Sequence, residues 1–353
     1  MILLRILLFL LGAALVARTL FSAIQTFVLP RGANDALARL VFLSLRRLFN
    51  LYLRKPRSYK QIDRWMAFYA PVSLLSLLPY WMFLLAIGYT LMVWAVGAGT
   101  WYHSLRISGS SLLTLGYETE KMLPVTLLEF SEAVVGLTMV ALLIAYLPSM
   151  YSAFSRREAA VTLLEVRAGD PPTAIEMLAR YHRIHNLERL NEQWALWEVW
   201  FADVEESHTS LAALVFFRSP QPNHSWVTAA GAVLDAASLT LSAVDIRYDA
   251  QAALCIRAGY LAFRRIADFF NIPYTPAPSY PAEPLSVTRL DFDRALAELE
   301  AAGVPLKADH EQAWRDFAGW RVNYDSLLLA LARLTLAPPS PWTGERSYLQ
   351  ITT

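Results

Sequence analysis

The sequence predicts an all-α membrane protein in which membrane-spanning helices are followed by a helical domain outside the bilayer. Hydrophobic residues make up 56% of the 353 residues and charged residues only 17%. Soluble proteins are about 45–50% apolar and about 25% charged, so part of this chain is expected to lie in lipid. Two long stretches without charge indicate the membrane-spanning part. The pattern changes to amphipathic helices after residue 158, which indicates the domain outside the bilayer.

The two uncharged stretches predict where the chain crosses the membrane. No Asp, Glu, Lys or Arg occurs in residues 65–105, a run of 41, or in residues 133–155, a run of 23. One membrane helix needs about 20 residues. The first run therefore holds one crossing and material for much of another, and the second run holds one crossing. We predict an outer helix, a re-entrant segment and an inner helix over residues 65–158.

Residues 1–30 allow two interpretations. Arg5 followed by the apolar stretch 6–17 fits a signal peptide, but Leu15 at its end is a poor match to a small-x-small cleavage site. The interpretation we favour is an additional N-terminal membrane helix that carries Arg18 in mid-span. A central arginine costs roughly 2.5–3.5 kcal/mol on insertion scales. Arg18 is therefore expected to reach the interface or to face a neighbouring segment rather than lipid.

The loop charges predict the orientation. Nine cations lie between the first apolar segment and residue 65, whereas the loop between the later helices holds only Arg106 and Lys121. By the positive-inside rule, the 98–123 loop is outside and the basic segment 31–64 is cytoplasmic. We therefore expect a multi-pass protein of the cell inner membrane with a cytoplasmic C-terminal domain.

Part of the basic segment also has a helical pattern. Leucines recur at helical spacing over residues 35–53, with the arginines set elsewhere. This pattern is typical of a helix on the inner membrane surface, although a helix packed against the protein's own domain has the same pattern.

The segment between the two uncharged runs holds the most specific motif, Thr114-Leu115-Gly116-Tyr117. Irregular backbone at membrane depth is tolerated only where it is buried in protein or lines a water-filled path. Backbone carbonyls, a threonine hydroxyl and a permissive glycine are the parts of a cation filter, in which carbonyls replace the ion's hydration water. In this motif and the Pro124-Val125-Thr126 after it, residues 65–158 resemble the pore-loop potassium-channel superfamily.

The resemblance implies a short pore helix at 106–113 and four copies around an axis, hence a homotetrameric channel. It implies monovalent cations as the transported species, K⁺ first among them, and an ion pathway formed by Thr114, Leu115, Gly116, Tyr117 and Glu118. The chain departs from the family where Glu118 replaces the second filter glycine. In a tetramer Glu118 would form a ring of four carboxylates at the outer mouth, which attracts cations without selecting potassium over sodium.

Two carboxylates and a glycine at the start of the inner helix are predicted to support the pore. Glu129 and Glu132 lie three residues apart on one face, with Gly136 one turn further on. Intramembrane carboxylates are costly and usually face a partner, here Arg106 or the serine hydroxyls of 108–111. In the alternative interpretation Glu129 still lies at the interface and only Glu132 is embedded. Gly136 is either a bend or a close-packing site.

Residues 159–336 predict a helical cytoplasmic domain, and residues 337–353 a Pro-rich tail. Gly169-Asp170-Pro171-Pro172 is expected to end one helix and open the next, with Asp170 as the N-cap. The apolar run 226–244 carries Asp235 at its centre, which favours a buried bundle helix over a membrane span. Trp194, Trp197 and Trp200 have the spacing of a buried stripe. Helices are predicted near 186–206, 226–244, 247–270, 288–301 and 310–335.

The sequence also argues against several classes of function. No nucleophile-elbow, phosphate-loop or dinucleotide motif is present, so we predict neither an enzyme nor a cofactor. A net charge of +1 argues against a nucleic-acid partner, and the single Cys255 excludes an intrachain disulfide. His182, His185 and Glu188 could share a helix face, but a solvated face is favoured over a metal site.

Two hypotheses stay open. One is a cation channel with a helical regulatory or assembly domain. The other is a non-conducting, membrane-anchored interaction or scaffold protein with a degenerate pore module, for which Glu118 is the argument.

Overall fold

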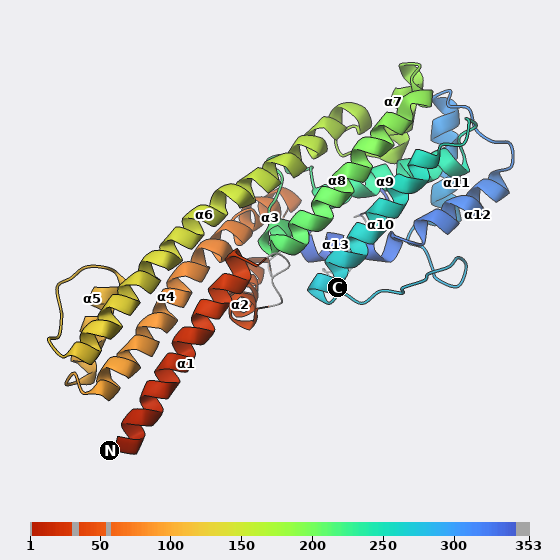
Figure 1. Ribbon diagram of the computed structural model, residues 1–353. Helices are drawn as coiled ribbons and strands as arrows, with labels where there is room; N and C mark the ends of the chain where they lie inside the picture. Colours follow the sequence, from red (N-terminus) through yellow and green to blue (C-terminus); the bar gives the residue numbers. More distant parts are fainter. Residues whose placement is uncertain (1, 30–34, 54–57, 344–353) are drawn as a thin grey trace. The chain divides into compact units, whose positions relative to one another are not determined.

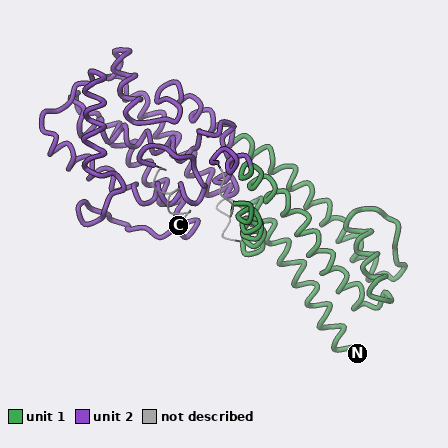
Figure 2. The backbone as a smooth tube through the Cα atoms, turned by 180° about the vertical axis from the view of Figure 1, so that it is seen from behind, with its two compact units in different colours: residues 1–57, 65–152 green, residues 58–64, 153–353 purple. Residues whose placement is uncertain are grey.

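The computed structural model describes residues 2–29, 35–53 and 58–343, and their regular structure is helical (Figure 1). The only strand-type pairing among these residues is an isolated bridge between Val244 and Leu306. The chain divides into two compact units (Figure 2). Unit 1 comprises residues 1–57 and 65–152, and unit 2 comprises residues 58–64 and 153–353.

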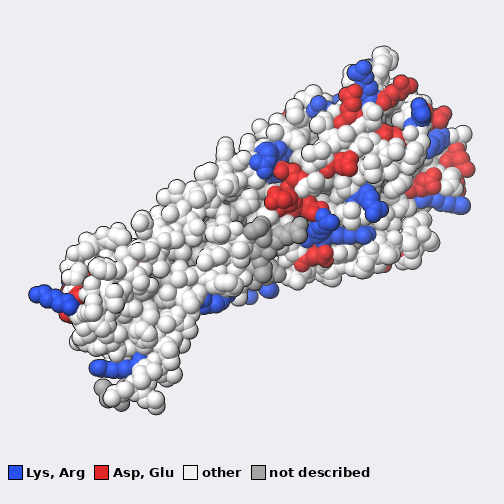
Figure 3. All heavy atoms as spheres, viewed as in Figure 1, with Lys and Arg blue, Asp and Glu red and all other residues white. Residues whose placement is uncertain are grey.

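Unit 1 contains the membrane helices, and an all-α membrane protein is thereby confirmed in outline. Three helical stretches are long and apolar enough to cross a membrane: Ile2–Phe27, Tyr59–Val96 and Leu123–Ala168. On the face shown in Figure 3 the helices of unit 1 carry few charged side chains, whereas Lys, Arg, Asp and Glu are frequent on unit 2. The elements of unit 1 are α1 (Ile2–Phe27), α2 (Ala36–Leu53), α4 (Tyr69–Val96), α5 (Trp101–Leu112) and the first part of α6 (Leu123–Ala168).

The N-terminal segment forms one continuous helix, α1, as the favoured interpretation predicts. It packs closely on α4 because both helices lack a side chain at the crossing. A Cβ at Gly12 would lie 2.5 Å from the Gly88 carbonyl oxygen, and a Cβ at Gly88 would lie 2.7 Å from Val16 Cγ2. Small residues at a helix crossing allow this approach, which drives association in lipid.

Arg18 faces a neighbouring segment, as predicted. Its Nη2 donates to Asp35 Oδ1 at 2.7 Å. Asp35 also caps α2 by accepting from the Ala38 N–H at 2.8 Å, and it accepts a hydrogen bond from Ser22. Trp81 of α4 donates in turn to Ser22 Oγ at 3.0 Å. A single carboxylate thus neutralises the arginine and starts the next helix.

The predicted helix in the basic segment is confirmed as α2. One of its faces packs on the protein itself, and its location on the membrane surface stays a prediction. Phe49 is buried and packs on Tyr69 of α4, with ring centroids 5.7 Å apart. Leucines on the other side, including Leu40, Leu48 and Leu51, are more than half exposed. One face of α2 therefore packs in unit 1 and the other presents apolar side chains.

The inner helix is much longer than predicted. α6 has 46 residues, which at 1.5 Å per residue is about 69 Å, more than twice the roughly 30 Å thickness of the hydrocarbon core. The division between the units falls within it, after Ser152. Its charged last turns, from Arg156 onward, belong to unit 2.

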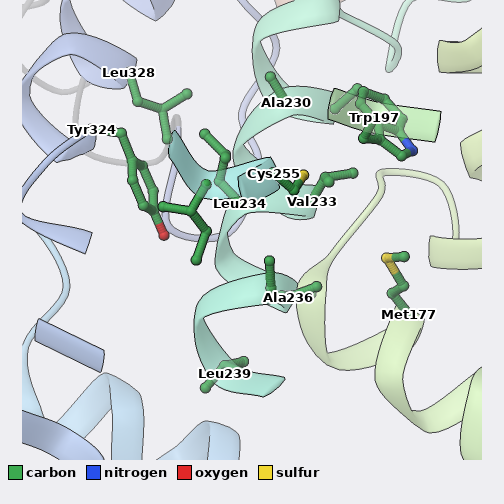
Figure 4. Close-up of a cluster of buried hydrophobic side chains, with 14 of the residues drawn as sticks. Met177, Trp197, Ala230, Val233, Leu234, Ala236, Leu239, Cys255, Tyr324 and Leu328 are labelled. Atoms are coloured by element: carbon green, nitrogen blue, oxygen red, sulfur yellow. The ribbon is translucent and has the colours of Figure 1, made fainter. Parts of the chain in front are cut away.

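Unit 2 is a helical bundle around α9, as predicted for the apolar run with Asp235. All 17 residues of α9 are buried, and Figure 4 shows its side chains surrounded by residues such as Met177, Trp197, Cys255 and Tyr324. The predicted tryptophan stripe is buried in the same core. The helices of the bundle are α7 (Ala174–Arg183), α8 (Leu190–Ser210), α9 (Trp226–Ser242), α10 (Ala250–Phe270), α11 (Arg289–Ala301), α12 (His310–Arg321) and α13 (Asp325–Thr335), together with most of α3 (Tyr59–Met66).

Three sequence predictions about helix ends were wrong. Gly169 ends α6 with φ +85° as expected, but the N-cap of the next helix is Thr173, whose hydroxyl accepts from the Glu176 N–H, and not Asp170. The helix predicted over 310–335 is two helices, because the chain turns at 322–324. The short helix before the filter-like motif begins at Trp101, since Thr100 caps it. The predicted tail lies outside the described residues from 344 onward.

Candidate functional site

The candidate site is the loop of residues 113–122 with the short helix α5 that leads into it. Thr100 Oγ1 caps α5 by accepting from the His103 N–H at 3.3 Å. Ile107 of α5 is fully buried against Val93 of α4 and Val125 of α6. Contacts with α4 and α6 therefore hold α5 between the two long helices.

Gly136 lets the end of α5 approach α6. A Cβ at Gly136 would lie 2.2 Å from the carbonyl oxygen of Leu112, the last residue of α5. Of the two roles that the sequence leaves open, this contact supports close packing. Any side chain at this position would push the end of α5, and with it the loop, away from the helix.

Ser108 connects α5 to both long helices through polar contacts. Its hydroxyl lies 2.6 Å from Glu132 Oε1 of α6 and 3.2 Å from the Ala86 carbonyl oxygen of α4. Glu132 is fully buried, and its Oε2 has no hydrogen-bond partner among the described residues. Ser108 is one of the serines predicted from the sequence as partners of this carboxylate. The contact holds the buried carboxyl group of Glu132 against α5, the helix that leads into the loop.

Glu129 contacts the loop itself and not α5. Its Oε1 accepts a hydrogen bond from the Glu120 N–H at 3.0 Å. Thr126, on the same first turns of α6, donates to the Glu120 carbonyl oxygen at 3.0 Å. The two predicted pore-support carboxylates thus act at different places: Glu132 behind α5, and Glu129 at the return of the loop into α6.

The Thr-Leu-Gly-Tyr motif begins as the C-terminal cap of α5. The Thr114 N–H donates to the Ser111 carbonyl at 3.0 Å and the Leu115 N–H to the Ser110 carbonyl at 2.8 Å. This pair of hydrogen bonds is a Schellman motif, which requires a left-handed residue after the helix. Thr114 takes that conformation with φ +53° although it is β-branched, and Gly116 follows with φ +68°. A β-branched residue at positive φ is a strained outlier.

The motif faces open space within this chain. Leu115 is 60% exposed and Tyr117 56% exposed, and no atom lies within 4 Å of a Cβ built on Gly116. Within the described part of the chain, no hydrogen bond is made to the carbonyl oxygens of residues 114–117. The backbone oxygens that follow α5 are therefore available to a ligand or to another copy of the chain.

Glu118, which the resemblance places in a ring of four carboxylates, has partners within its own chain. Its Oε2 lies 2.7 Å from Arg106 Nη2, its Oε1 lies 3.6 Å from His103 Nδ1, and its backbone N–H donates to Ser110 Oγ at 3.0 Å. Sequence reasoning missed His103. The signal was its position one turn before Arg106, since residues three apart lie on one helix face.

Comparison with known proteins adds no relative to these observations. No family model, curated protein or solved structure matches the chain.

Proposed function

We propose that the chain is the subunit of a homotetrameric cation channel, with the backbone of Thr114 to Tyr117 on the ion pathway and K⁺ as the preferred ion. The observation that carries the proposal is the placement of α5. A short helix, held between two membrane helices by Ser108 and Gly136, ends directly at an exposed backbone segment with free carbonyl oxygens. The C-terminal end of a helix carries partial negative charge, which favours a cation next to it.

The tetramer requires a face on which copies can meet, and α6 offers one. Exposed apolar side chains recur along α6 at alternating steps of four and three residues: Leu123, Leu127, Phe130, Val134 and Leu137. This 3.5-residue spacing is that of helices which pack against one another over several turns. The stripe is distinct from the one containing Val125, Glu129, Glu132 and Gly136, which is buried inside the chain.

Glu118 has a different role in this proposal from the one that the resemblance implies. With Arg106 at 2.7 Å, four copies of Glu118 would bring four compensating arginines with them. We therefore assign Glu118 to holding the loop on α5, with a small effect on the local cation concentration.

The proposed membrane orientation places the loop of residues 98–123 outside the cell and unit 2 in the cytoplasm of a bacterial-type inner membrane. It follows from the nine cations between the first apolar segment and residue 65, against two in the loop. A cysteine introduced at the exposed Lys121 should react with an impermeant reagent in intact cells, and labelling only after lysis would overturn this orientation.

Ion flux from liposomes tests the channel directly. Purified protein should release K⁺ faster than Na⁺, and Gly116→Ala should abolish the flux because alanine disfavours a φ of +68°. Gly109→Ala is the matched control: it adds the same methyl group to open space nearby, but inside α5. Both variants should have the same oligomeric state in detergent as the parent. Equal flux from the two variants would mean that the motif is not on an ion pathway.

A non-conducting membrane protein with a helical interaction domain is the second candidate. The Schellman cap and the Arg106–Glu118 ion pair favour it, because they give the loop a stable conformation within one chain. A monomer or dimer in detergent, together with no cation release from liposomes, would select this candidate over the channel.

A further inference from the structure

A second group of polar side chains gathers in unit 2, at the end of α6. It consists of Glu165 in the penultimate turn of α6, Asp170 in the turn after it, and His224 immediately before Ser225, the N-cap of α9. His224 Nε2 lies 3.6 Å from Glu165 Oε2 and 3.7 Å from Asp170 Oδ1. One atom from each of the three residues lies within 4.8 Å of the other two.

These separations differ from those of a hydrogen-bonded ion pair. A charge-assisted N–H···O bond is about 2.7–2.9 Å long, and both contacts of the imidazole nitrogen are well beyond that length. Ligand atoms that share a tetrahedral ion at about 2.0–2.2 Å lie about 3.4 Å from each other. The spacing of the three side chains therefore fits a shared cation better than a shared proton.

The histidine supplies a second observation that points to a ligand. Its side chain is only 4% exposed, and its Nε2 is directed at the two carboxylates. No described residue hydrogen-bonds this nitrogen. Coordination to a metal would give this nitrogen the partner that no described side chain supplies.

We propose that Glu165, Asp170 and His224 bind a divalent transition-metal ion, with Zn²⁺ as the ion that fits best. One imidazole nitrogen and two carboxylate oxygens are ligands that Zn²⁺ accepts, with water at the remaining position. Ca²⁺ and Mg²⁺ prefer sites made of oxygen alone. The carboxylates are 49% and 41% exposed, so an ion can enter from solvent.

The ion would connect segments that are far apart in the sequence. Glu165 belongs to α6, Asp170 to the turn that Gly169 makes possible with φ +85°, and His224 to the loop that starts α9. Binding would tie the end of α6 to the start of the buried central helix. Because the site assembles only in the folded chain, metal binding also stabilises unit 2.

No other histidine offers such a site within residues 2–29, 35–53 and 58–343. His182, His185 and Glu188, which the sequence analysis weighed as a metal group, do not bring three ligand atoms together within the described residues. His103 contacts Glu118 through Nδ1 at 3.6 Å and Glu120 through Nε2 at 3.5 Å. Because the two carboxylates lie at opposite nitrogens of one ring, they cannot share an ion with it.

Isothermal titration of the tag-free full chain in detergent with ZnCl₂ tests the proposal. We expect one Zn²⁺ per chain, a rise in melting temperature with excess Zn²⁺, and much weaker binding of Mg²⁺ and Ca²⁺. Loss of a ligand should weaken binding by at least as much as loss of an outer-shell partner, which costs about 10–100-fold. His224→Ala should therefore abolish binding under the same conditions, while His310→Ala, which removes an exposed histidine, should bind as the parent does.

The two carboxylates keep the test decisive if the buried His224 is needed for folding. Asp170→Asn and Glu165→Gln change exposed side chains, so both variants should fold and both should lose most of the Zn²⁺ affinity. The proposal is overturned if the parent chain binds no Zn²⁺. It is equally overturned if the carboxylate variants bind as the parent does, or if His310→Ala loses the same affinity as His224→Ala.

Discussion

Two buried acids, Asp235 in unit 2 and Glu132 in unit 1, are compensated in opposite ways. In unit 2, Asp235 is 2% exposed and is ion-paired with the fully buried Arg321. It also accepts from the Tyr324 hydroxyl at 2.9 Å. In unit 1, Glu132 is fully buried with a single described partner, the Ser108 hydroxyl. No described cation lies within ion-pair distance of it.

This difference separates stability from function. A fully paired buried charge is in itself weak evidence for a stabilising or a functional role. Removing one partner of the pair, however, leaves an uncompensated buried charge and is strongly destabilising. An acid at membrane depth without a cation is costly in any state of the protein, and such residues usually mark ion or proton paths. The Asp235 network is thus expected to govern folding, and Glu132 to govern what the loop does.

The largest expected effect is that of removing the cation from the unit 2 network. Arg321→Met would leave Asp235 and Asp325 buried without the guanidinium that donates to both. We expect a loss of about 3–5 kcal/mol of unfolding free energy, measured by urea unfolding of the full chain in detergent. Arg315→Met is the control, because Arg315 is 64% exposed and should change stability by less than about 0.5 kcal/mol. A loss of unfolding free energy below about 1 kcal/mol in Arg321→Met would contradict the role of the Asp235 network in folding.

The next effect tests the packing of α5 in unit 1. Gly136→Ala places a methyl group 2.2 Å from the Leu112 carbonyl oxygen, so either α5 or α6 must move. Overpacking of this kind costs about 1–3 kcal/mol. The melting temperature in detergent should fall, and cation flux with it. Gly109→Ala should be neutral or stabilising by up to about 1 kcal/mol, since it adds a helix-favouring residue in open space. Equal melting temperatures for the two variants would contradict the close contact.

A pH dependence follows from a buried histidine of unit 2. Burial, together with the neighbouring Arg157, lowers the pKa of His208 well below its usual value. In the unfolded chain His208 takes up a proton near pH 6.5, whereas in the folded chain it stays neutral. The unfolded state therefore binds more protons below that pH, and stability falls as the pH is lowered, by about 1.4 kcal/mol per pH unit. In His208→Gln this part of the slope between pH 7 and pH 5 should disappear. A slope equal to that of the parent would show that His208 titrates normally.

The smallest effect on stability is expected at Glu132. Glu132→Gln keeps an oxygen that can accept from Ser108 and removes only the carboxyl group, so unfolding free energy should change by less than about 1 kcal/mol. Cation flux should fall nonetheless, because the acidic group packed against α5 is lost. Asp235→Asn, which removes one of the two carboxylates paired with Arg321, should cost more stability than Glu132→Gln and leave flux unchanged. If Glu132→Gln cost more stability than Asp235→Asn, or if Asp235→Asn lowered the flux and Glu132→Gln did not, the assignment of Asp235 to folding and Glu132 to function would be wrong.

Sequence reasoning predicted the helices of both units because their signals are local. Uncharged runs located α4 and the membrane part of α6, the apolar run that carries Asp235 located the buried α9, and the tryptophan spacing indicated the buried face of α8. Helix ends were predicted less well where two residues near the end of the helix could both act as the cap. Asp170 looked like an N-cap before two prolines, yet Thr173 takes that position.

The geometry of the candidate site depends on contacts across the fold that a single sequence does not display. The pattern indicated the loop, the carboxylates and a hydroxyl partner for Glu132. It did not indicate that Arg106 and His103 would lie against Glu118, or that Thr114 would close α5 in a left-handed conformation. The grouping of Glu165, Asp170 and His224 was also missed, because His224 lies 54 residues from Asp170 in the chain.

The ion pair between Arg18 and Asp35 has a consequence for how the chain enters the membrane. Its two members lie 17 residues apart, and chains are synthesised from the N-terminus at about 5–20 residues per second. For roughly 1–3 s, Arg18 has emerged from the ribosome while Asp35 is still inside it. During that interval α1 carries an uncompensated arginine, and its stable insertion has to wait for the start of α2. A ribosome-bound chain stopped while Asp35 is still inside the ribosome should therefore hold α1 in the bilayer less firmly than one stopped after Asp35 has emerged.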